Sequence, residues 1–262
     1  MLESISTKAP KSVDEESTKK ETAALIEKMK KLQDVLYAEN KNSLLIVLQG
    51  MDASGKDSTV RHVFGDLNPM SIYVKSFKKP TIEEYSYDFL RRVHKHTPPK
   101  GMIHIFNRSH YEDVLVPEVH KTFKSDIIAR RYDYINSFEA MLIDNNTHVM
   151  KFYLHMSRDE QVRRFQSRLV RPEKYWKYNP ADIEESRSWD KYMAVYEKIF
   201  KKCSSKIPWT IVPADDKWYR NNIIATAVVK KLESLKMKYP KGFFDDEENR
   251  IKAKEALKDY KK

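Results

Sequence analysis

The feature that most constrains this chain is residues 44–59, where an apolar run leads directly into a glycine-rich loop. Residues 44–48 are Leu-Leu-Ile-Val-Leu, a pattern typical of a strand that is buried on both faces of a parallel sheet. Gly50, Gly55 and Lys56 then have the spacing of a phosphate loop, whose backbone N–H groups surround phosphate oxygens. A helix that starts at Lys56 would add its positive N-terminal end. The stretch therefore predicts an α/β fold with a phosphate-binding loop.

The loop departs from its common form at one position. The residue after the lysine is usually a Ser or Thr that holds magnesium, but in this chain it is Asp57. Magnesium takes hard carboxylate oxygens and needs one or two protein ligands beside phosphates and water, so Asp52 is the predicted substitute. The predicted phosphate-binding positions of the loop are Gly50, Ala53, Ser54, Gly55, Lys56, Asp57 and Ser58.

The size and composition of the chain favour one α/β domain. The chain has 262 residues, of which 40% are hydrophobic and 33% charged, and we expect residues 1–262 to form a single domain. No apolar run reaches the roughly 18 to 20 residues of a membrane span, and the N-terminus does not resemble a secretion signal. Cys203 is the single cysteine. An intrachain disulfide is therefore excluded, and a reducing cytoplasm is the expected location.

The charge of the chain indicates a polyanionic partner or substrate. The formal net charge is +11, with 49 Lys and Arg against 38 Asp and Glu. Nucleic acid, a nucleotide and inorganic polyphosphate all fit this charge. The charge alone does not choose among them, so the positions of the arginines carry more information.

Strand and helix patterns alternate along the chain. Besides residues 44–48, strands are predicted at 72–77, 102–106, 149–154 and 209–212. A first helix is predicted to end near Asn40, and a second to run from Lys56 to near Gly65. Further helices are predicted from Thr81 to just before Pro98 and over residues 128–142. The last two are predicted to start at Ser157 and at Pro180, and the helix from Pro180 continues to Phe200. This alternation predicts a five-stranded parallel sheet with ligands at the carboxyl ends of its strands.

The two ends of the chain are predicted to lie outside the sheet. Residues up to about Ser17 are polar and are expected to be a flexible lead-in. Residues 1–40 would thus comprise this extension and one amphipathic helix that packs outside the sheet. From about Phe243 the chain is highly charged, and residues 243–262 are expected to form a surface helix or a frayed tail.

A second group of polar residues follows the third predicted strand. Asp113 lies where it could reach the same metal as Asp52, and two carboxylates on one magnesium ion would orient bridged phosphates for in-line transfer. Arg108 has the fork geometry that suits phosphate oxygens. For Glu112 and Asp113, acids at the start of a surface helix remain an alternative. The histidines have no metal-ligand spacing, so no zinc site is predicted.

A third group of residues lies at about 157–182, which we predict to be a lid. An apolar stripe is formed by Val162, Phe165 and Leu169, and the basic residues that lie off this stripe or follow it are Arg164, Arg168, Arg171, Lys174 and Lys177. An arginine ladder followed by a basic loop is typical of kinase lids that close over the transferred phosphate. A solvated basic face on a surface helix remains the alternative.

Four motifs in this order resemble those of the family-2 polyphosphate kinases, over roughly residues 36–213. They are residues 50–57, residues 76–84, residues 105–113, and the stretch from Arg168 through Trp176 and Lys177. The resemblance implies a three-layer P-loop kinase fold similar to thymidylate kinase, with a helical lid and magnesium-dependent phosphoryl transfer. It also implies that Lys56 contacts the transferred phosphate, that Asp52 and Asp113 serve the metal and the attacking phosphate, and that Arg108 and Arg168 bind phosphate groups.

The leading hypothesis is a reversible phosphoryl transfer between inorganic polyphosphate and a nucleoside di- or monophosphate, such as ADP to ATP. The expected partners are polyphosphate, a purine nucleotide (ADP/ATP, GDP/GTP or AMP), magnesium and further copies of this chain, without nucleic acid. An ordinary ATP-dependent nucleotide kinase is the first alternative, although the basic residues at 163–177 exceed what a triphosphate needs. A nucleic-acid-binding module with a vestigial phosphate loop is the second, and it predicts salt-dependent binding without turnover.

Overall fold

The computed structural model describes residues 2–242 and 245–260 and places a five-stranded sheet at the centre of the chain. All four strand pairings are parallel, and the strand order is β2-β3-β1-β4-β5. The strands are β1 (Ser43–Gln49), β2 (Ile72–Ser76), β3 (Ile103–Asn107), β4 (Thr147–His155) and β5 (Trp209–Pro213). The prediction of a five-stranded parallel sheet is therefore confirmed.

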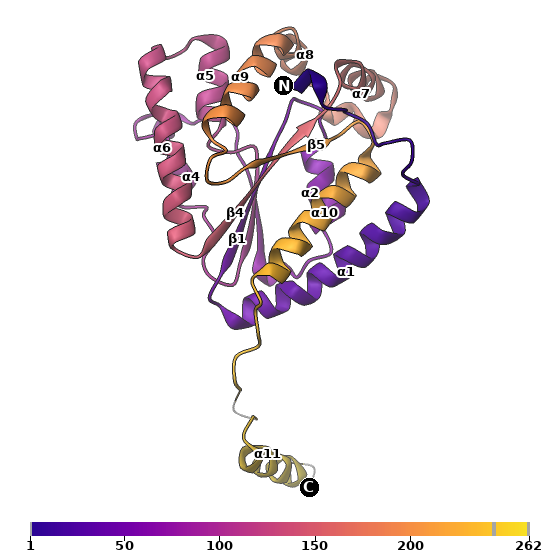
Figure 1. Cartoon of the computed structure of the whole chain (residues 1–262), viewed down its shortest axis with the longest axis vertical. Helices are drawn as coiled ribbons and strands as arrows, with labels where there is room; N and C mark the ends of the chain where they lie inside the picture. Colours follow the sequence, from indigo (N-terminus) through magenta and orange to yellow (C-terminus); the bar gives the residue numbers. More distant parts are fainter. Residues whose placement is uncertain (1, 243–244, 261–262) are drawn as a thin grey trace.

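Helices cover both faces of the sheet, which gives three layers (Figure 1). The α-helices are α1 (Glu15–Glu39), α2 (Lys56–Phe64), α3 (Ile82–Tyr85), α4 (Arg91–His94), α5 (Glu112–His120), α6 (Ser125–Asp144), α7 (Arg158–Val170), α8 (Pro180–Ser186), α9 (Trp189–Lys202), α10 (Lys217–Ser234) and α11 (Glu247–Asp259). Short 3-10 helices are η1 (Leu2–Ser4), η2 (Pro69–Ser71) and η3 (Pro172–Lys177).

Strand β1 lies between β3 and β4, and each of its residues is buried. Its side chains alternate between two apolar cores. Leu45 and Val47 belong to the core that includes residues of α5, α6 and α9, whereas Leu44, Ile46 and Leu48 belong to the core with residues of α1, α2 and α10. Helices on both faces explain why this strand is apolar without alternation, and the arrangement fixes the phosphate loop at the carboxyl end of the central strand.

Two predicted helices are each divided in the structure. The helix predicted from Thr81 to Pro98 is α3 followed by α4, because the side chain of Asp88 accepts hydrogen bonds from the backbone N–H groups of Leu90 and Arg91 and starts a new turn there. The helix predicted from Pro180 to Phe200 is α8 followed by α9, with a break before Trp189. Helix α10 was not predicted, and α5 agrees with the alternative that placed Glu112 and Asp113 at the start of a helix.

The prediction of a flexible lead-in is wrong for the start of the described chain. Leu2 is buried and its backbone N–H donates to Glu197 Oε1 at 2.7 Å. The Thr7 hydroxyl donates to Asp215 Oδ2 at 2.8 Å, and the Asp215 N–H donates to the Thr7 carbonyl at 3.0 Å. A polar segment can be fixed by such backbone bonds, which composition does not reveal. Helix α1 then packs against α10 outside the sheet, as predicted.

The charged C-terminal segment contains helix α11, which lies apart from the sheet and its helices (Figure 1). This helix agrees with the first of the two predictions for the tail, although residues 243, 244, 261 and 262 lie outside the described part. Among the described residues, no helix combines the length and the apolar character that crossing a membrane requires.

Candidate active site

The phosphate loop connects β1 to α2 in a backbone conformation that depends on glycine. Gly55 has φ +101°, and a Cβ atom there would lie 2.1 Å from Nη1 of Arg220, so no other residue fits without displacing this arginine. Ala53 also has a positive φ of 65°, a conformation that persists only when the surrounding structure imposes it. The two predicted positions after the lysine have side-chain partners: Asp57 accepts from the Asn107 amide, and the Ser58 hydroxyl accepts from Arg220 Nη2 at 3.3 Å.

Lys56 lies across the mouth of this loop with its side chain buried. Its Nζ donates to the carbonyl oxygens of Gly50 at 2.7 Å and Met51 at 3.1 Å. Burial lowers the pKa of Lys56, and the nearby Arg108 lowers it further, whereas Asp52 opposes the shift. The ammonium group is thus already positioned at the loop, where it can exchange carbonyl partners for phosphate oxygens.

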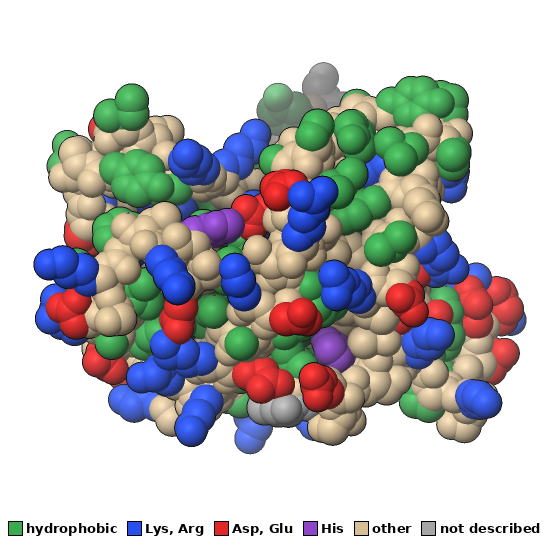
Figure 2. All heavy atoms as spheres, turned by 90° about the horizontal axis from the view of Figure 1, so that it is seen from above, with side chains coloured by type: hydrophobic (Ala, Val, Ile, Leu, Met, Phe, Trp, Pro, Cys, Tyr) green, Lys and Arg blue, Asp and Glu red, His purple; other side chains and the backbone are tan. Residues whose placement is uncertain are grey.

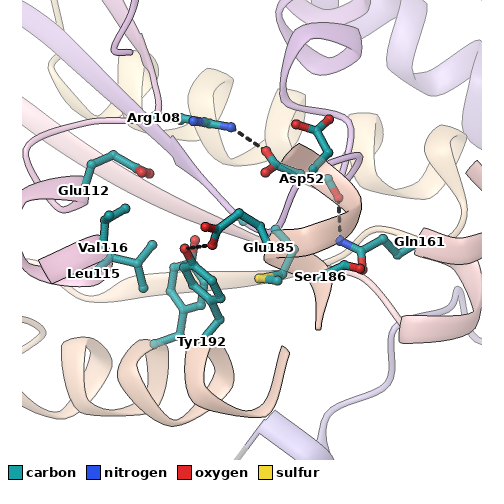
Figure 3. Close-up of a pocket in the computed structure, with 13 residues that line it drawn as sticks. Asp52, Arg108, Glu112, Leu115, Val116, Gln161, Glu185, Ser186 and Tyr192 are labelled. Atoms are coloured by element: carbon teal, nitrogen blue, oxygen red, sulfur yellow. Dashed lines mark hydrogen bonds and ion pairs between the residues drawn. The ribbon is translucent and has the colours of Figure 1, made fainter. Parts of the chain in front are cut away.

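A cavity of about 200 Å³ opens beside the loop at the carboxyl end of the sheet (Figure 3). Asp52 and Arg108 form an ion pair at this cavity, and the side chain of Glu112 points into the same space. The other residues that line the cavity are Gly50, Met51, Leu115, Val116, Gln161, Asp182, Glu185, Ser186, Tyr192 and Tyr196. The cavity therefore combines one cation, several carboxylates and apolar walls.

The ion pair of Asp52 and Arg108 is stabilised by its surroundings. Burial alone would raise the pKa of Asp52, but Lys56 and Arg108 lower it below its ordinary value. Burial alone would likewise lower the pKa of Arg108, but Glu112 and Asp52 raise it. Arg108 has a positive φ of 61°, and its N–H donates to the Leu48 carbonyl at 3.0 Å. This unusual backbone conformation directs the guanidinium towards the loop.

Asp113 lies at the start of α5, but its carboxylate has a partner different from that of Asp52. Its Oδ2 lies 3.4 Å from Nη2 of the buried Arg92, and burial raises its pKa to about 6. Asp113 does not line the cavity described above, whereas its neighbour Glu112 does. The predicted pairing of Asp52 and Asp113 on one metal ion therefore stays a prediction.

The chemistry of these side chains fits magnesium. The described residues contain no group of three or more His, Cys, Asp or Glu side chains arranged for a metal ion. Magnesium in phosphoryl transfer is commonly bound by one or two carboxylates together with phosphate oxygens and water. Asp52, inside the loop and at the cavity, is the carboxylate best placed for such a site.

Arg164 of the predicted lid is fixed to the loop and to the end of β5. Its Nη1 donates to the Ala53 carbonyl at 2.8 Å, and its Nη2 donates to the Ala214 carbonyl at 2.7 Å. Its Nε donates to Glu160 Oε1 at 2.6 Å. Gln161 of the same helix donates to the Asp52 carbonyl at 2.9 Å (Figure 3). Helix α7 therefore holds two consecutive carbonyl groups of the phosphate loop.

The remaining lid cations have partners within the lid itself. Arg168 Nη1 lies 2.8 Å from Asp182 Oδ2, and Arg171 Nε donates to Glu173 Oε1 at 2.7 Å. Lys174 donates to the Ser167 hydroxyl at 2.7 Å, and Lys177 lies over the ring of Trp176. In the apolar stripe of α7, Phe165 is buried whereas Val162 and Leu169 are about half exposed. The predicted contacts of these cations with phosphate stay predictions.

Several residues that line the cavity or contact the phosphate loop were not predicted as site residues. Tyr192 and Tyr196 belong to a run of aromatic residues on α9 whose helical spacing is typical of a buried face, and both are buried but also line the cavity. The Tyr192 hydroxyl donates to Glu185 Oε2 at 2.6 Å (Figure 3). Arg220 on α10 reaches the loop from behind. Spacing along one helix indicates a buried face, but it does not reveal that a cavity opens beside that face.

The face of the molecule at the carboxyl ends of the strands carries many charged side chains. Figure 2 shows Lys and Arg side chains spread across this face, with Asp and Glu side chains between them. Polyanions are attracted to such a surface in a salt-dependent way. Because acidic side chains lie between the cations and repel an anion, a polyanion can bind only where cations are grouped, which favours binding at defined positions.

Comparison with known proteins gives one consistent result. The family model of Polyphosphate kinase 2 matches residues 12–240. The chain is 47% identical over 219 residues to AMP/ADP-polyphosphate phosphotransferase of Meiothermus ruber, covering 83% of this chain and 82% of that protein. It is 42% identical over 228 residues to ADP-polyphosphate phosphotransferase of Rhodopseudomonas palustris, covering 82% and 79%.

A solved structure agrees with these relatives. The crystal structure of polyphosphate kinase 2 from Arthrobacter aurescens TC1 superposes with a TM-score of 0.94 at 37% sequence identity. The match covers 97% of this chain and 93% of that one. The α/β fold that the glycine-rich loop and the alternation of strands and helices predicted is confirmed, and so is the P-loop kinase fold that the resemblance implied.

Proposed function

The chain belongs to the polyphosphate kinase 2 family, and from this premise we propose that it transfers a phosphoryl group reversibly between inorganic polyphosphate and a nucleoside di- or monophosphate. The observation that carries the proposal is the phosphate loop with Lys56 beside a cavity that contains Asp52 and Arg108, below a basic lid. This arrangement provides positioning and neutralisation of charge, which are the main requirements of phosphoryl transfer.

Three cationic groups have separate tasks in this proposal. Lys56 moves from the Gly50 and Met51 carbonyls to the oxygens of the transferred phosphate. Arg108 binds the phosphate of the nucleotide in the cavity, where its pKa ensures that it stays charged. Arg168 of the lid leaves Asp182 and binds phosphate oxygens when the lid closes. Each group stabilises charge that is spread over phosphate oxygens in the transition state.

Magnesium is the proposed cofactor. We propose that Asp52 holds it, with Asp113 as the predicted second carboxylate once Asp113 separates from Arg92. Magnesium held there would supply positive charge that neutralises the phosphate groups during transfer. When Asp52 binds the ion, its ion pair with Arg108 breaks, and the Arg108 guanidinium becomes available to the phosphate of the nucleotide.

Adenine nucleotides are the proposed acceptors. The two relatives described above carry AMP/ADP and ADP in their names, which supports ADP, with AMP as a second acceptor. A relative from Mycolicibacterium smegmatis named for GDP is 31% identical over 202 residues, so guanine nucleotides belong in the test. We further propose a cytoplasmic location and a homo-oligomer, the latter to be checked by light scattering on the purified protein.

The deciding experiment is to incubate AMP, ADP, GMP and GDP separately with magnesium, with and without long-chain polyphosphate. We expect ATP to form from ADP when polyphosphate is present. No product from any nucleotide with polyphosphate would contradict the proposal, and activity that requires ATP as donor would favour an ordinary nucleotide kinase. Binding of nucleic acid at physiological salt without turnover would instead support a binding module.

A further inference from the structure

Helix α10 places a buried arginine directly behind the phosphate loop. Arg220 has no exposed surface. Its Nη1 lies 3.4 Å from the Ser54 carbonyl oxygen, and its Nη2 lies 3.3 Å from the Ser58 hydroxyl. Asn221 Oδ1 accepts from its Nε at 3.2 Å and its Nη2 at 2.9 Å. The guanidinium is thus fixed against the loop from the side opposite to the solvent.

The charge of Arg220 has no acidic partner in the described part of the chain. Its hydrogen-bond acceptors are a carbonyl, a hydroxyl and an amide oxygen, all of them neutral. Arg92, the other arginine that is buried in the described residues, lies within 3.5 Å of both Glu84 and Asp113. Burial and, to a lesser extent, the nearby Arg164 lower the pKa of Arg220 to about 9. This value lies above neutral pH, so the guanidinium keeps its charge.

A buried charge without a counter-ion is costly unless something compensates it. The nearest place where an anion could bind is the phosphate loop. Arg220 lies directly against this loop, since a Cβ atom on Gly55 would lie 2.1 Å from its Nη1. A phosphate bound in the loop would bring negative charge to the other side of this glycine. Such a phosphate is the counter-ion that the chain does not supply.

Arg220 also fixes the direction of one loop peptide. The described residues contain no cis peptide bond, and in a trans peptide the C=O and the following N–H point in opposite directions. Arg220 holds the Ser54 carbonyl towards α10, which directs the Gly55 N–H away from α10 and towards the mouth of the loop. Gln161 and Arg164 hold the carbonyls of Asp52 and Ala53 in the same manner. The orientation of the loop therefore depends on three side chains outside it.

We propose that Arg220 is a positioning residue for phosphoryl transfer, which directs the Ser54–Gly55 peptide and acts as the buried counter-charge of the phosphate chain in the loop. The inference rests on the proposed function for the identity of that chain. Because its charge acts on ground state and transition state alike, Arg220 mainly affects the affinity for polyphosphate and has less influence on turnover at saturation.

The test compares Arg220→Met with Arg220→Lys in steady-state kinetics at varied polyphosphate concentration. We expect Arg220→Met to raise KM for polyphosphate at least about tenfold, with kcat reduced less than about threefold. Arg220→Lys keeps an amine but loses the planar fork that reaches both Ser54 and Ser58, so its KM should lie between those of the original protein and Arg220→Met. Arg130→Met is the matched control, since this exposed arginine on α6 pairs with Asp126 and its loss changes the net charge equally.

A second readout measures binding without catalysis. Tripolyphosphate should raise the melting temperature of the original protein, and the increase in Arg220→Met should be less than half as large. Removing an uncompensated buried charge should not lower the melting temperature of the ligand-free protein by more than a few degrees. A lower melting temperature with unchanged KM and an unchanged tripolyphosphate effect would mean that Arg220 is merely structural and would overturn the inference.

Two further experiments test the inference if Arg220→Met does not fold or if the proposed function fails. If Arg220→Met does not fold, Asn221→Ala removes the acceptor that orients Arg220, and a KM for polyphosphate equal to the original would overturn the inference. If the original protein does not turn over polyphosphate, the proposed function fails. Tripolyphosphate binding then decides the role of Arg220, because an equal thermal effect in both proteins contradicts it.

Discussion

The phosphate loop and the lid both present cations to the same end of the sheet, but they hold these cations in opposite ways. At the loop, Lys56 and Arg220 are buried and bonded to backbone carbonyls, and no carboxylate of residues 2–242 or 245–260 is in direct contact with either of them. In the lid, Arg168 and Arg171 are paired with Asp182 and Glu173. The loop is therefore ready to receive an anion, whereas the lid must exchange acidic partners for phosphate.

This difference predicts how each region responds to mutation. A cation that is desolvated and preoriented acts at full strength on a developing charge, because no reorganisation is required at the moment of reaction. A lid cation contributes less because it must first leave its carboxylate partner, and the exposed Arg171 is also screened by water and salt. Substitutions at the loop should thus cost far more than substitutions in the lid, and the order of effects tests the comparison.

The largest effect is expected for Lys56→Met. The substitution removes the ammonium group that lies 2.7 Å from the Gly50 carbonyl at the mouth of the loop. Turnover should fall by about a thousandfold, which corresponds to roughly 4 kcal/mol of transition-state stabilisation. The assay is polyphosphate-dependent ATP formation, with the melting temperature as the control for folding. Turnover within tenfold of the original would show that the loop cation is dispensable.

Asp52→Asn and Asp113→Asn should each lower turnover by at least about a hundredfold, or roughly 2.7 kcal/mol. Asp52 lines the cavity beside the loop, and Asp113 would have to leave Arg92 to share its metal ion. Magnesium titrations of both variants are the measurement, and chelation of magnesium should abolish turnover in the original protein. A variant with normal rate and normal magnesium dependence would remove its residue from the metal site.

The sequence revealed the loop better than the lid for a physical reason. The positions of Gly50, Gly55 and Lys56 follow from local backbone geometry, which a short motif records completely. The partners of the lid cations depend on where α8 lies, and the spacing of Arg164 and Arg168 along one helix does not reveal it. Arg164 thus contacts loop carbonyls although the pattern placed it on a ladder facing phosphate.

Residues that support the loop from other elements were beyond the reach of pattern analysis. Arg220 lies 166 positions from Ser54 in the sequence and meets it because α10 packs next to α2. Tyr196 has the spacing of a core residue and is buried, yet it also lines the cavity. The parallel sheet, by contrast, followed from the alternation of apolar strands with helices, since helices cover both faces of the central strands β1 and β3, which are buried throughout.

Substitutions of Arg168 should have an intermediate effect on turnover, and they separate the contribution of its charge from that of its planar fork. Arg168→Lys keeps the charge but loses the planar fork, and we expect it to lower turnover about fivefold, with Arg168→Ala lowering it about thirtyfold. Arg163→Ala is the control, because Arg163 on the same helix is exposed and paired with Glu160. Unchanged kinetics in both Arg168 variants, with unchanged melting temperature, would mean that the pair with Asp182 is a surface ion pair only.

The smallest effect is expected for the double variant Lys174→Gln and Lys177→Gln. In the part of the chain that the structure describes, neither side chain has a carboxylate partner: Lys174 donates to the Ser167 hydroxyl, and Lys177 lies over the Trp176 ring. They should attract the phosphate chain through solvent rather than contact the transferred group. KM for long-chain polyphosphate should therefore rise about threefold at low ionic strength, with kcat unchanged.

The salt dependence of KM tests whether Lys174 and Lys177 act on polyphosphate through long-range attraction. Screening by about 0.5 M salt shortens the range of exposed charges to a few ångströms, so the KM difference between the double variant and the original should vanish there. The effect of Lys56→Met should persist at the same salt concentration, because a buried group at the loop is screened much less. A lysine effect that survives high salt would place these side chains in direct contact with phosphate. The lid would then hold cations in the manner of the loop, and the contrast between the two regions would disappear.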